Sequence, residues 1–116
     1  MDELLKLTLL YDFYGELLTE KQKQVYEFHY QNDMSFSEIG AELSTSRQAV
    51  RDLLKRTEKI LFGYEEKLHL VERFAQQQKA IRKMKVILDE IKIHDDNPQV
   101  ESAILAMKEI ADDILS

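Results

Sequence analysis

Residues 18–56 read LTEKQKQVYEFHYQNDMSFSEIGAELSTSRQAVRDLLKR, and the fold of the chain follows from the pattern in this segment. Its caps and apolar spacings predict three short helices, of which the last two form a helix-turn-helix. In that motif one short helix supports a second helix, whose outer face can lie in the major groove of DNA. The segment therefore predicts both a local fold and a mode of recognition.

Capping patterns indicate where the three helices begin. Thr19 and Gln22 form a capping box, in which a hydroxyl and an amide side chain satisfy backbone N–H groups at a helix start. Ser35 and Glu38 repeat the same spacing, and Ser46 caps the third helix after a short turn. Apolar residues at helical spacing predict the buried sides of the three helices: Val25 and Phe28, then Ile39 and Leu43, then Val50, Leu53 and Leu54.

Two glycines have predicted structural roles. Gly40 is small enough to let the next helix approach closely. Upstream, residues 2–14 predict a first helix with Asp2 as its N-cap, and Gly15 fits the left-handed position that ends a helix.

The second half of the chain predicts a long helical stretch. No proline occurs between residues 46 and 92, and a continuous helix over that range would be ~70 Å long at about 1.5 Å per residue. That exceeds an ordinary helix of a small domain, so we expect a break or kink near Gly63 or residues 76–78.

A final helix is predicted after a short loop. Asn97 is suited to the N-cap, and Pro98 to the first helical position, where its missing N–H costs nothing. Because the loop is short, we expect this helix to fold back on residues 75–92 as a helical hairpin.

Composition agrees with an all-α fold. The chain is 44% apolar and 33% charged, with three Gly and one Pro, and no alternating strand pattern is visible. We predict an N-terminal helix-turn-helix bundle over residues 1–62. A helical arm or hairpin is predicted over residues 63–116, packed with the first part or on a partner.

The net charge of −6 is unfavourable for a nucleic-acid binder, but the charges are segregated. Residues 44–59 contain five bases and two acids, which gives +3. Residues 73–85 contain five bases and no acid, which gives +5, whereas residues 95–116 contain six acids and one Lys, which gives −5. Local basic zones of this kind can bind phosphate in an acidic protein.

The third helix of the segment carries the candidate binding site. Its capped N-terminus presents free N–H groups that can meet a phosphate. Arg and Gln in its first turns are suited to bidentate contacts with guanine and adenine, and the basic residues one turn later to phosphate contacts. The alternative is that these are ordinary solvated charges. The candidate nucleic-acid-binding residues are Ser46, Arg47, Gln48, Arg51, Lys55 and Arg56.

Other kinds of site are not indicated. The chain has no Cys, which excludes disulfides and cysteine-based zinc sites or nucleophiles, and its three His are scattered over separate predicted helices. We therefore expect no catalytic residues, metal or cofactor, and no enzymatic activity. Residues 1–18 lack a basic leader, and no apolar run approaches the ~20 residues that cross a bilayer. We expect a cytoplasmic protein without membrane insertion.

The central segment resembles the C-terminal promoter-reading region of bacterial sigma factors. That resemblance covers part of the chain and implies the helix-turn-helix fold. The matching residues are Leu18, Thr19, Gln22, Val25, Ser35, Glu38, Ile39, Leu43, Ser46, Ala49, Val50, Leu54 and Arg56.

A resemblance over most of the chain points to a narrower family. The phrases LLYDFYGELLTEKQKQVYEFHY, SFSEIGAEL, SRQAVRDLLKRTEKIL and YEEKL are similar to the YlxM family of small bacterial proteins. The resemblance implies a helix-turn-helix protein. Genes of that family lie beside those of the signal recognition particle GTPases, which implies a role in that pathway or in its regulation.

Two functions are therefore expected from the sequence. The first is a nucleic-acid-binding accessory or regulatory protein of the signal recognition particle pathway, with duplex DNA or the particle's RNA as ligand. The second is a protein-interaction adaptor, whose long apolar stripe binds a pathway GTPase or a second copy without contacting nucleic acid. A homodimer through the long helix is expected in either case.

Overall fold

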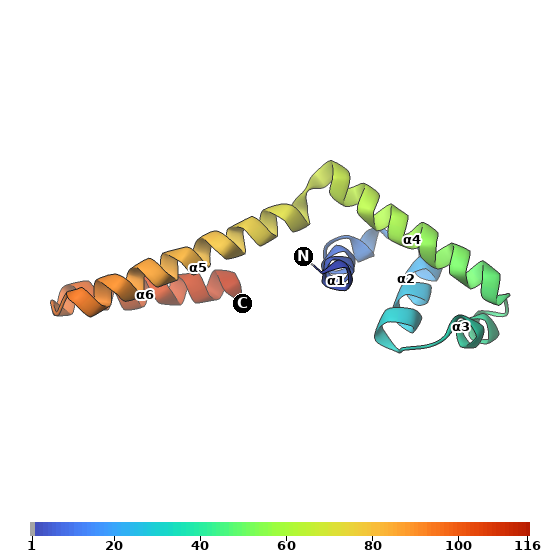
Figure 1. The fold of residues 1–116 in the computed structure, drawn as a ribbon, viewed down its shortest axis with the longest axis horizontal. Coiled ribbons are helices and arrows are strands. Elements are labelled where there is room, and N and C mark those ends of the chain that lie inside the picture. Colours follow the sequence, from blue (N-terminus) through green and yellow to red (C-terminus); the bar gives the residue numbers. More distant parts are fainter. Residues whose placement is uncertain (1) are drawn as a thin grey trace. The chain divides into compact units, whose positions relative to one another are not determined.

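The computed structural model describes residues 2–116, which form helices joined by short turns and contain no strand (Figure 1). The all-α class predicted from the sequence is confirmed. In chain order the elements are α1 (Glu3–Tyr14), the 3-10 helix η1 (Gly15–Leu17), α2 (Glu20–Tyr26), the π-helical turn η2 (Glu27–Gln31), α3 (Phe36–Leu43), α4 (Arg47–Leu68), α5 (Leu70–His94) and α6 (Pro98–Leu115).

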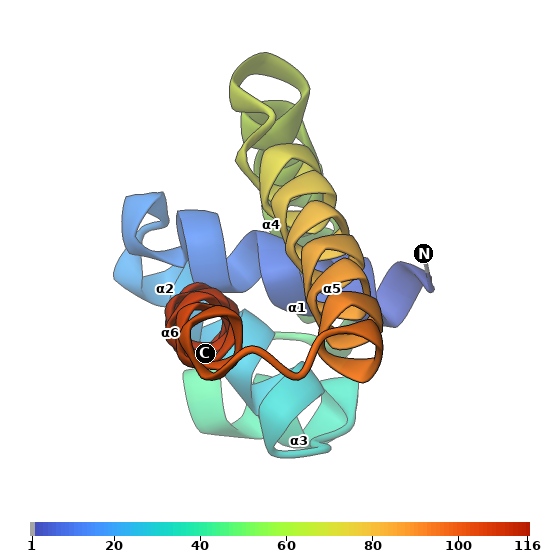
Figure 2. The same ribbon diagram turned by 90° about the vertical axis from the view of Figure 1, so that its left-hand side faces the viewer.

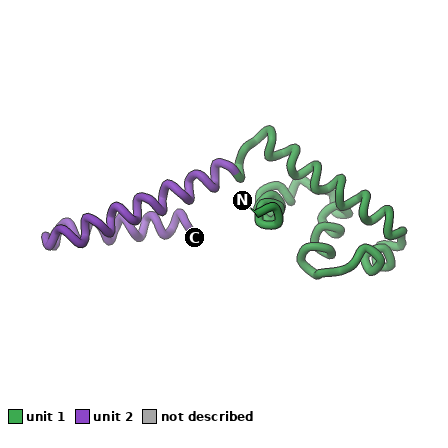
Figure 3. The backbone as a smooth tube through the Cα atoms, in the orientation of Figure 1, with its two compact units in different colours: residues 1–71 green, residues 72–116 purple. Residues whose placement is uncertain are grey.

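The chain divides into two compact units, residues 1–71 and residues 72–116 (Figure 3). The sequence assigned residues 63–71 to the arm, but these residues lie in the first unit. The reason is that Val71 packs in the core of that unit and Glu65 is bonded to Tyr14 of α1.

The predicted caps are confirmed at each helix start. Thr19 with Gln22, and Ser35 with Glu38, form complete capping boxes, with both reciprocal hydrogen bonds in place. Ser46 accepts a hydrogen bond from the Ala49 N–H, and Asn97 caps α6, with Pro98 at its first position. Asp2 likewise accepts from the Leu4 N–H at the start of α1. Local hydrogen bonding therefore sets where these helices begin.

Helix α4 provides the side against which α1, α2 and α3 pack. Its buried stripe begins at Val50 and continues through Leu54, Thr57 and Leu61 to Glu65. The C-terminal part of the stripe joins a core cluster that contains Leu7, Leu10, Tyr14, Leu18, Tyr26, Leu61 and Val71. The N-terminal part joins a second cluster that contains Val25, Ile39, Val50 and Leu54.

The expected left-handed glycine after α1 is wrong. Gly15 has φ −56° and ψ −34°, which is right-handed helical, and the chain continues into η1 instead of stopping. The space for a side chain there is limited for a different reason. A Cβ on Gly15 would lie 3.1 Å from the Tyr11 ring, so close packing rather than a turn explains the glycine.

The expected break in the long helix is confirmed, but its expected position is wrong. Helix α4 ends at Leu68. Its C-cap His69 has a left-handed φ of 57°, and α5 starts at Leu70. Gly63 and residues 76–78 lie inside regular helix. The break therefore falls at a residue whose type gives little sign of it.

A buried network at the end of α4 accounts for the position of the break. The Glu65 carboxylate accepts hydrogen bonds from the Tyr14 hydroxyl at 2.6 Å and from the Val71 N–H at 2.9 Å. The Tyr14 hydroxyl in turn accepts from the Leu70 N–H at 3.1 Å. The N–H groups that open a helix have no helical partner, and here two of them are satisfied by side chains from α1 and α4.

The second unit is a helical hairpin, as predicted from the sequence. Helices α5 and α6 lie side by side in both views (Figures 1 and 2). Lys85 pairs with Asp112, and Lys108 pairs with Asp89, so two ion pairs join the helices. The side chains buried in the hairpin are Leu88, Ile104 and Ala111.

None of the helices described over residues 2–116 is long and apolar enough to cross a membrane.

Tyr14→Phe should lower the free energy of unfolding by about 1–3 kcal/mol. The change leaves the buried Glu65 without one donor and the Leu70 N–H without its acceptor. The measurement is urea unfolding followed by circular dichroism. Tyr64→Phe is the matched control, because the Tyr64 hydroxyl makes no hydrogen bond within residues 2–116. Equal stability of the two variants would contradict the network.

The stability of the wild type and of Tyr14→Phe should depend differently on pH in alkaline solution. Burial raises the pKa of Tyr14 above its ordinary 10.0, and the hydrogen bond to Glu65 raises it further. Above pH 10.0 the unfolded chain therefore loses a proton that the folded chain retains. The stability that Tyr14 contributes is complete below that pH and is lost as the pH rises towards the folded pKa. The unfolding free energy of the wild type should fall more steeply with pH than that of Tyr14→Phe, and parallel curves would contradict this account.

Candidate nucleic-acid interface

The turn between α3 and α4 is tight and depends on Gly40. Ser44 ends α3 in the left-handed conformation, with φ 56°, and both the Ser44 and Thr45 N–H groups donate to the Gly40 carbonyl. A Cβ on Gly40 would lie 2.7 Å from the Thr45 carbonyl oxygen. The close approach expected at Gly40 is therefore present, and its neighbour is the backbone of the turn.

The start of α4 leaves helix N–H groups available. The Ser46 hydroxyl accepts from the Ala49 N–H at 3.1 Å, and the Ser46 carbonyl accepts from the Val50 N–H at 3.1 Å. Regular helical bonding starts only at the fifth residue, so the N–H groups of Arg47 and Gln48 have no helical acceptor. They remain at an exposed helix N-terminus, where partial positive charge accumulates.

The inner side of α4 is fixed by packing. Val50 is fully buried and Leu54 nearly so, and both pack with Ile39 of α3 and Val25 of α2. The sequence predicted these residues as the inner face. Because that side is buried, the opposite side of the first two turns has to face outward.

The predicted contact residues all lie on the exposed part of α4. Ser46, Arg47, Gln48, Arg51, Lys55 and Arg56 are each exposed. Among residues 2–116 none of the four cations in that set forms an ion pair. Arg51 and Lys55 are four residues apart and therefore lie one above the other on the same side of the helix. The arrangement presents unpaired positive charge next to an open helix end.

Asp52 is the one acid in this part of α4, and Gln48 bonds to it. The Gln48 amide donates to the Asp52 carboxylate at 3.1 Å. Arg56 lies four residues after Asp52, but within the described residues these two side chains form no ion pair. Gln48 must therefore exchange its bond to Asp52 for one to a base if it reads sequence.

Arg56 lies on a different flank from Arg51, and it borders a groove between α4 and α2. The groove has a volume of about 380 Å³ and contains Lys21 of the first turn of α2. The sequence missed Lys21 as a candidate, because only tertiary packing brings α2 beside the turn. In the sequence, its positive charge was the only sign of a possible phosphate contact. The residues that line the groove are Lys21, Thr45, Ala49, Asp52, Leu53 and Arg56.

A short helix, a tight turn and a second helix with an exposed basic start define the class of a helix-turn-helix protein. Comparison with known proteins agrees. Residues 1–101 match the model of the UPF0122 family, which is described as "Putative helix-turn-helix protein, YlxM / p13 like". The chain belongs to this family.

Relatives of similar length occur in several bacteria. A UPF0122 protein of Caldanaerobacter subterraneus is 52% identical over 84 residues, which cover 72% of each chain. One from Thermoanaerobacter is 43% identical over 113 residues, or 97% of this chain and 94% of the relative. One from Bacillus cereus is 40% identical over 105 residues, or 90% of this chain and 96% of the relative. The likeness therefore extends over the hairpin as well as the first unit.

Gly40→Ala should destabilise the first unit by about 1–3 kcal/mol, because the new Cβ forces the backbone of the turn to move. Gly63→Ala is the control, since a Cβ there has no neighbour within 4 Å. In a helix that change should stabilise by about 0.5–1 kcal/mol. Urea unfolding of both variants measures the two changes in stability. An increase in stability for Gly40→Ala would contradict the tight turn.

Proposed function

We propose that the protein binds nucleic acid through the N-terminal part of α4, as an accessory or regulatory protein of the cytoplasm. The observation that supports this most strongly is the set of four exposed, unpaired cations beside an open helix N-terminus. Ser46, Arg47, Gln48 and Arg51 would meet the bases or the nearest phosphates. Lys55 and Arg56 would meet flanking phosphates.

Duplex DNA is the ligand that this geometry fits best. The major groove of B-DNA admits an α-helix, whereas the major groove of an RNA duplex is too narrow for side chains to read. The RNA of the signal recognition particle is the second ligand to test, because the gene neighbourhood of the family points to that pathway. A homodimer would place two reading helices on half-sites about one helical turn apart.

A second candidate function is that of an adaptor that binds a protein, such as a GTPase of the pathway, without contacting nucleic acid. The net charge of −6 favours it, because most of the protein repels phosphate. The apolar residues exposed on α5 and α6 also favour it, because they offer a surface suited to protein contact.

The double variant Arg47→Ala/Arg51→Ala should weaken nucleic-acid binding at least tenfold. It should also reduce the slope of log affinity against log salt by about two, since roughly one counterion is released per phosphate contact. Fluorescence anisotropy with labelled duplex DNA and with the particle's RNA, titrated from low to moderate salt, gives both quantities.

The matched control is Lys67→Ala/Lys92→Ala, which removes two exposed cations that lie outside the proposed interface. This control should bind like the wild type. Lys21→Ala should reduce the salt slope by about one if the groove beside Arg56 follows the phosphate backbone. If the Arg47/Arg51 variant and the control bind equally well, the interface is wrong. If the wild type binds neither ligand at low salt, the adaptor function is favoured.

A further inference from the structure

The hairpin of the second unit leaves one side uncovered. Only Leu88, Ile104 and Ala111 are buried in it, although both helices carry further large apolar side chains. Six of these, between 42% and 60% exposed, are called the apolar face below. They are Met84, Ile87 and Ile91 of α5 and Met107, Ile110 and Ile114 of α6.

Helical spacing places the six side chains on one side of the hairpin. In each helix the three residues follow one another at intervals of three and four, which forms a single stripe. The ion-paired residues Lys85 and Asp89 are each two residues from Ile87, about 200° around the helix. Because α6 runs antiparallel to α5, its own stripe faces the same side, and the ion pairs lie on the other.

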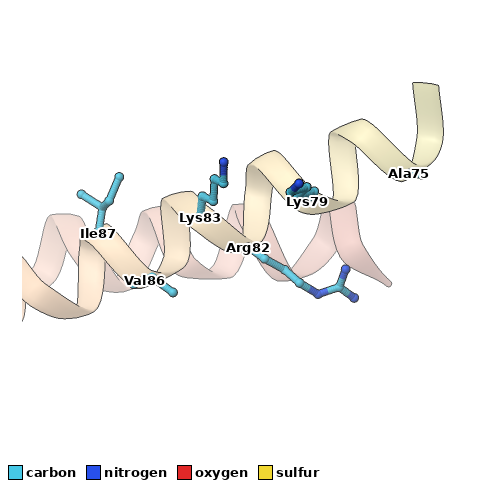
Figure 4. Close-up of a pocket in the computed structure, with 6 residues that line it drawn as sticks. All are labelled: Ala75, Lys79, Arg82, Lys83, Val86 and Ile87. Carbon is cyan, nitrogen blue, oxygen red and sulfur yellow. The ribbon is translucent and has the colours of Figure 1, made fainter. Parts of the chain in front are cut away.

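Figure 4 shows one residue of this face, Ile87, with its neighbours on α5. Ile87 and Lys83 point to one side of the helix, whereas Arg82 points to the opposite side and α6 lies behind. Lys83 is one turn from Ile87, so it borders the apolar face.

The residues of the apolar face lie in pairs, one from each helix, at matching heights along the hairpin. The ion pairs place Lys85 level with Asp112, and Asp89 level with Lys108. With the same register, each apolar residue of α5 has a counterpart on α6. The resulting levels are Met84 with Ile114, Ile87 with Ile110, and Ile91 with Met107.

We propose that a second copy of this chain covers the apolar face, and that the two hairpins form an antiparallel four-helix bundle. A two-fold axis parallel to the helices sets α5 of one copy against α6 of the other. It preserves the three levels, so that Ile87 meets the partner's Ile110. Such a contact is self-complementary, as a two-fold interface requires, and matches the packing of four-helix bundles.

Charge favours this pairing over the alternative two-fold arrangement. In the register of the ion pairs, residues 82–94 of α5 lie beside α6. They contain four bases and two acids, or +2, whereas α6 contains four acids and one Lys, or −3. Setting α5 against the partner's α6 brings opposite charges together, whereas setting α6 against the partner's α6 brings acids together. Lys83 also lies level with Asp113, which borders the α6 stripe, and neither residue has an ion pair within residues 2–116.

The area of the face is sufficient for a dimer. Helix α6 has 18 residues and is therefore ~27 Å long, and two helices side by side are ~20 Å wide. The flat footprint is about 540 Å² per copy, so two copies bury on the order of 1,000 Å². That lies at the lower limit for a specific interface, and its centre is apolar.

The apolar face would join the two copies of the homodimer considered under the proposed function. Its test uses no nucleic acid, so the dimer and the nucleic-acid interface can fail independently. Ile87→Glu should raise the dissociation constant of the dimer at least a hundredfold in sedimentation equilibrium. Ile93→Glu is the matched control, because Ile93 is 75% exposed and lies off the face. Ile110→Ala, a milder change, should raise the constant about tenfold with unchanged helicity. A wild type that is monomeric at all micromolar concentrations, or a control that dissociates as readily as Ile87→Glu, would overturn the proposal.

The arrangement of the helices can be tested separately, because the chain contains no Cys. Ile87→Cys and Ile110→Cys proteins are mixed, allowed to exchange subunits, and treated with a short bis-maleimide. The product that joins one of each should predominate. If Ile87→Cys alone crosslinks as well as the mixture does, α5 packs on the partner's α5 and the proposed axis is wrong.

Discussion

Burial of one stripe of α4, from Val50 to Glu65, is the constraint on which the first unit depends. At its N-terminal end the stripe packs on α2 and α3, which turns the basic start of the helix outward. At its C-terminal end Glu65 accepts hydrogen bonds from Tyr14 and the Val71 N–H, and Tyr14 accepts one from the Leu70 N–H, which fixes where α4 stops. The same helix therefore holds the exposed basic residues in place and sets the end of the bundle.

The features that could be predicted from the sequence are those that local chemistry determines. Thr19, Ser35 and Ser46 cap helices through hydrogen bonds to residues three positions on, so the pattern and the structure agree. The break at His69 and the glycine at residue 15 depend on contacts with distant or bulky neighbours, and no local pattern reveals these. Lys21 was missed for the same reason, since it reaches the α4 groove only through tertiary packing.

Each unit has one distinctive surface. The first unit presents, at the start of α4, cations that form no ion pair within residues 2–116. The second unit has two cross-helix ion pairs and, on one side, the apolar face. In the two proposals, phosphate contact would use the first surface and self-association the second, so the net charge of −6 would not prevent either.

The most direct test of the central claim is a map of backbone amide chemical shifts during titration with duplex DNA. The account predicts that the largest changes fall at Arg47, Gln48 and Arg51, with smaller ones near Lys21. The free N–H groups of Arg47 and Gln48 should shift strongly, because in the proposed complex they meet the phosphates. Changes confined to residues 72–116, or none in the first unit at saturating DNA, would contradict the account.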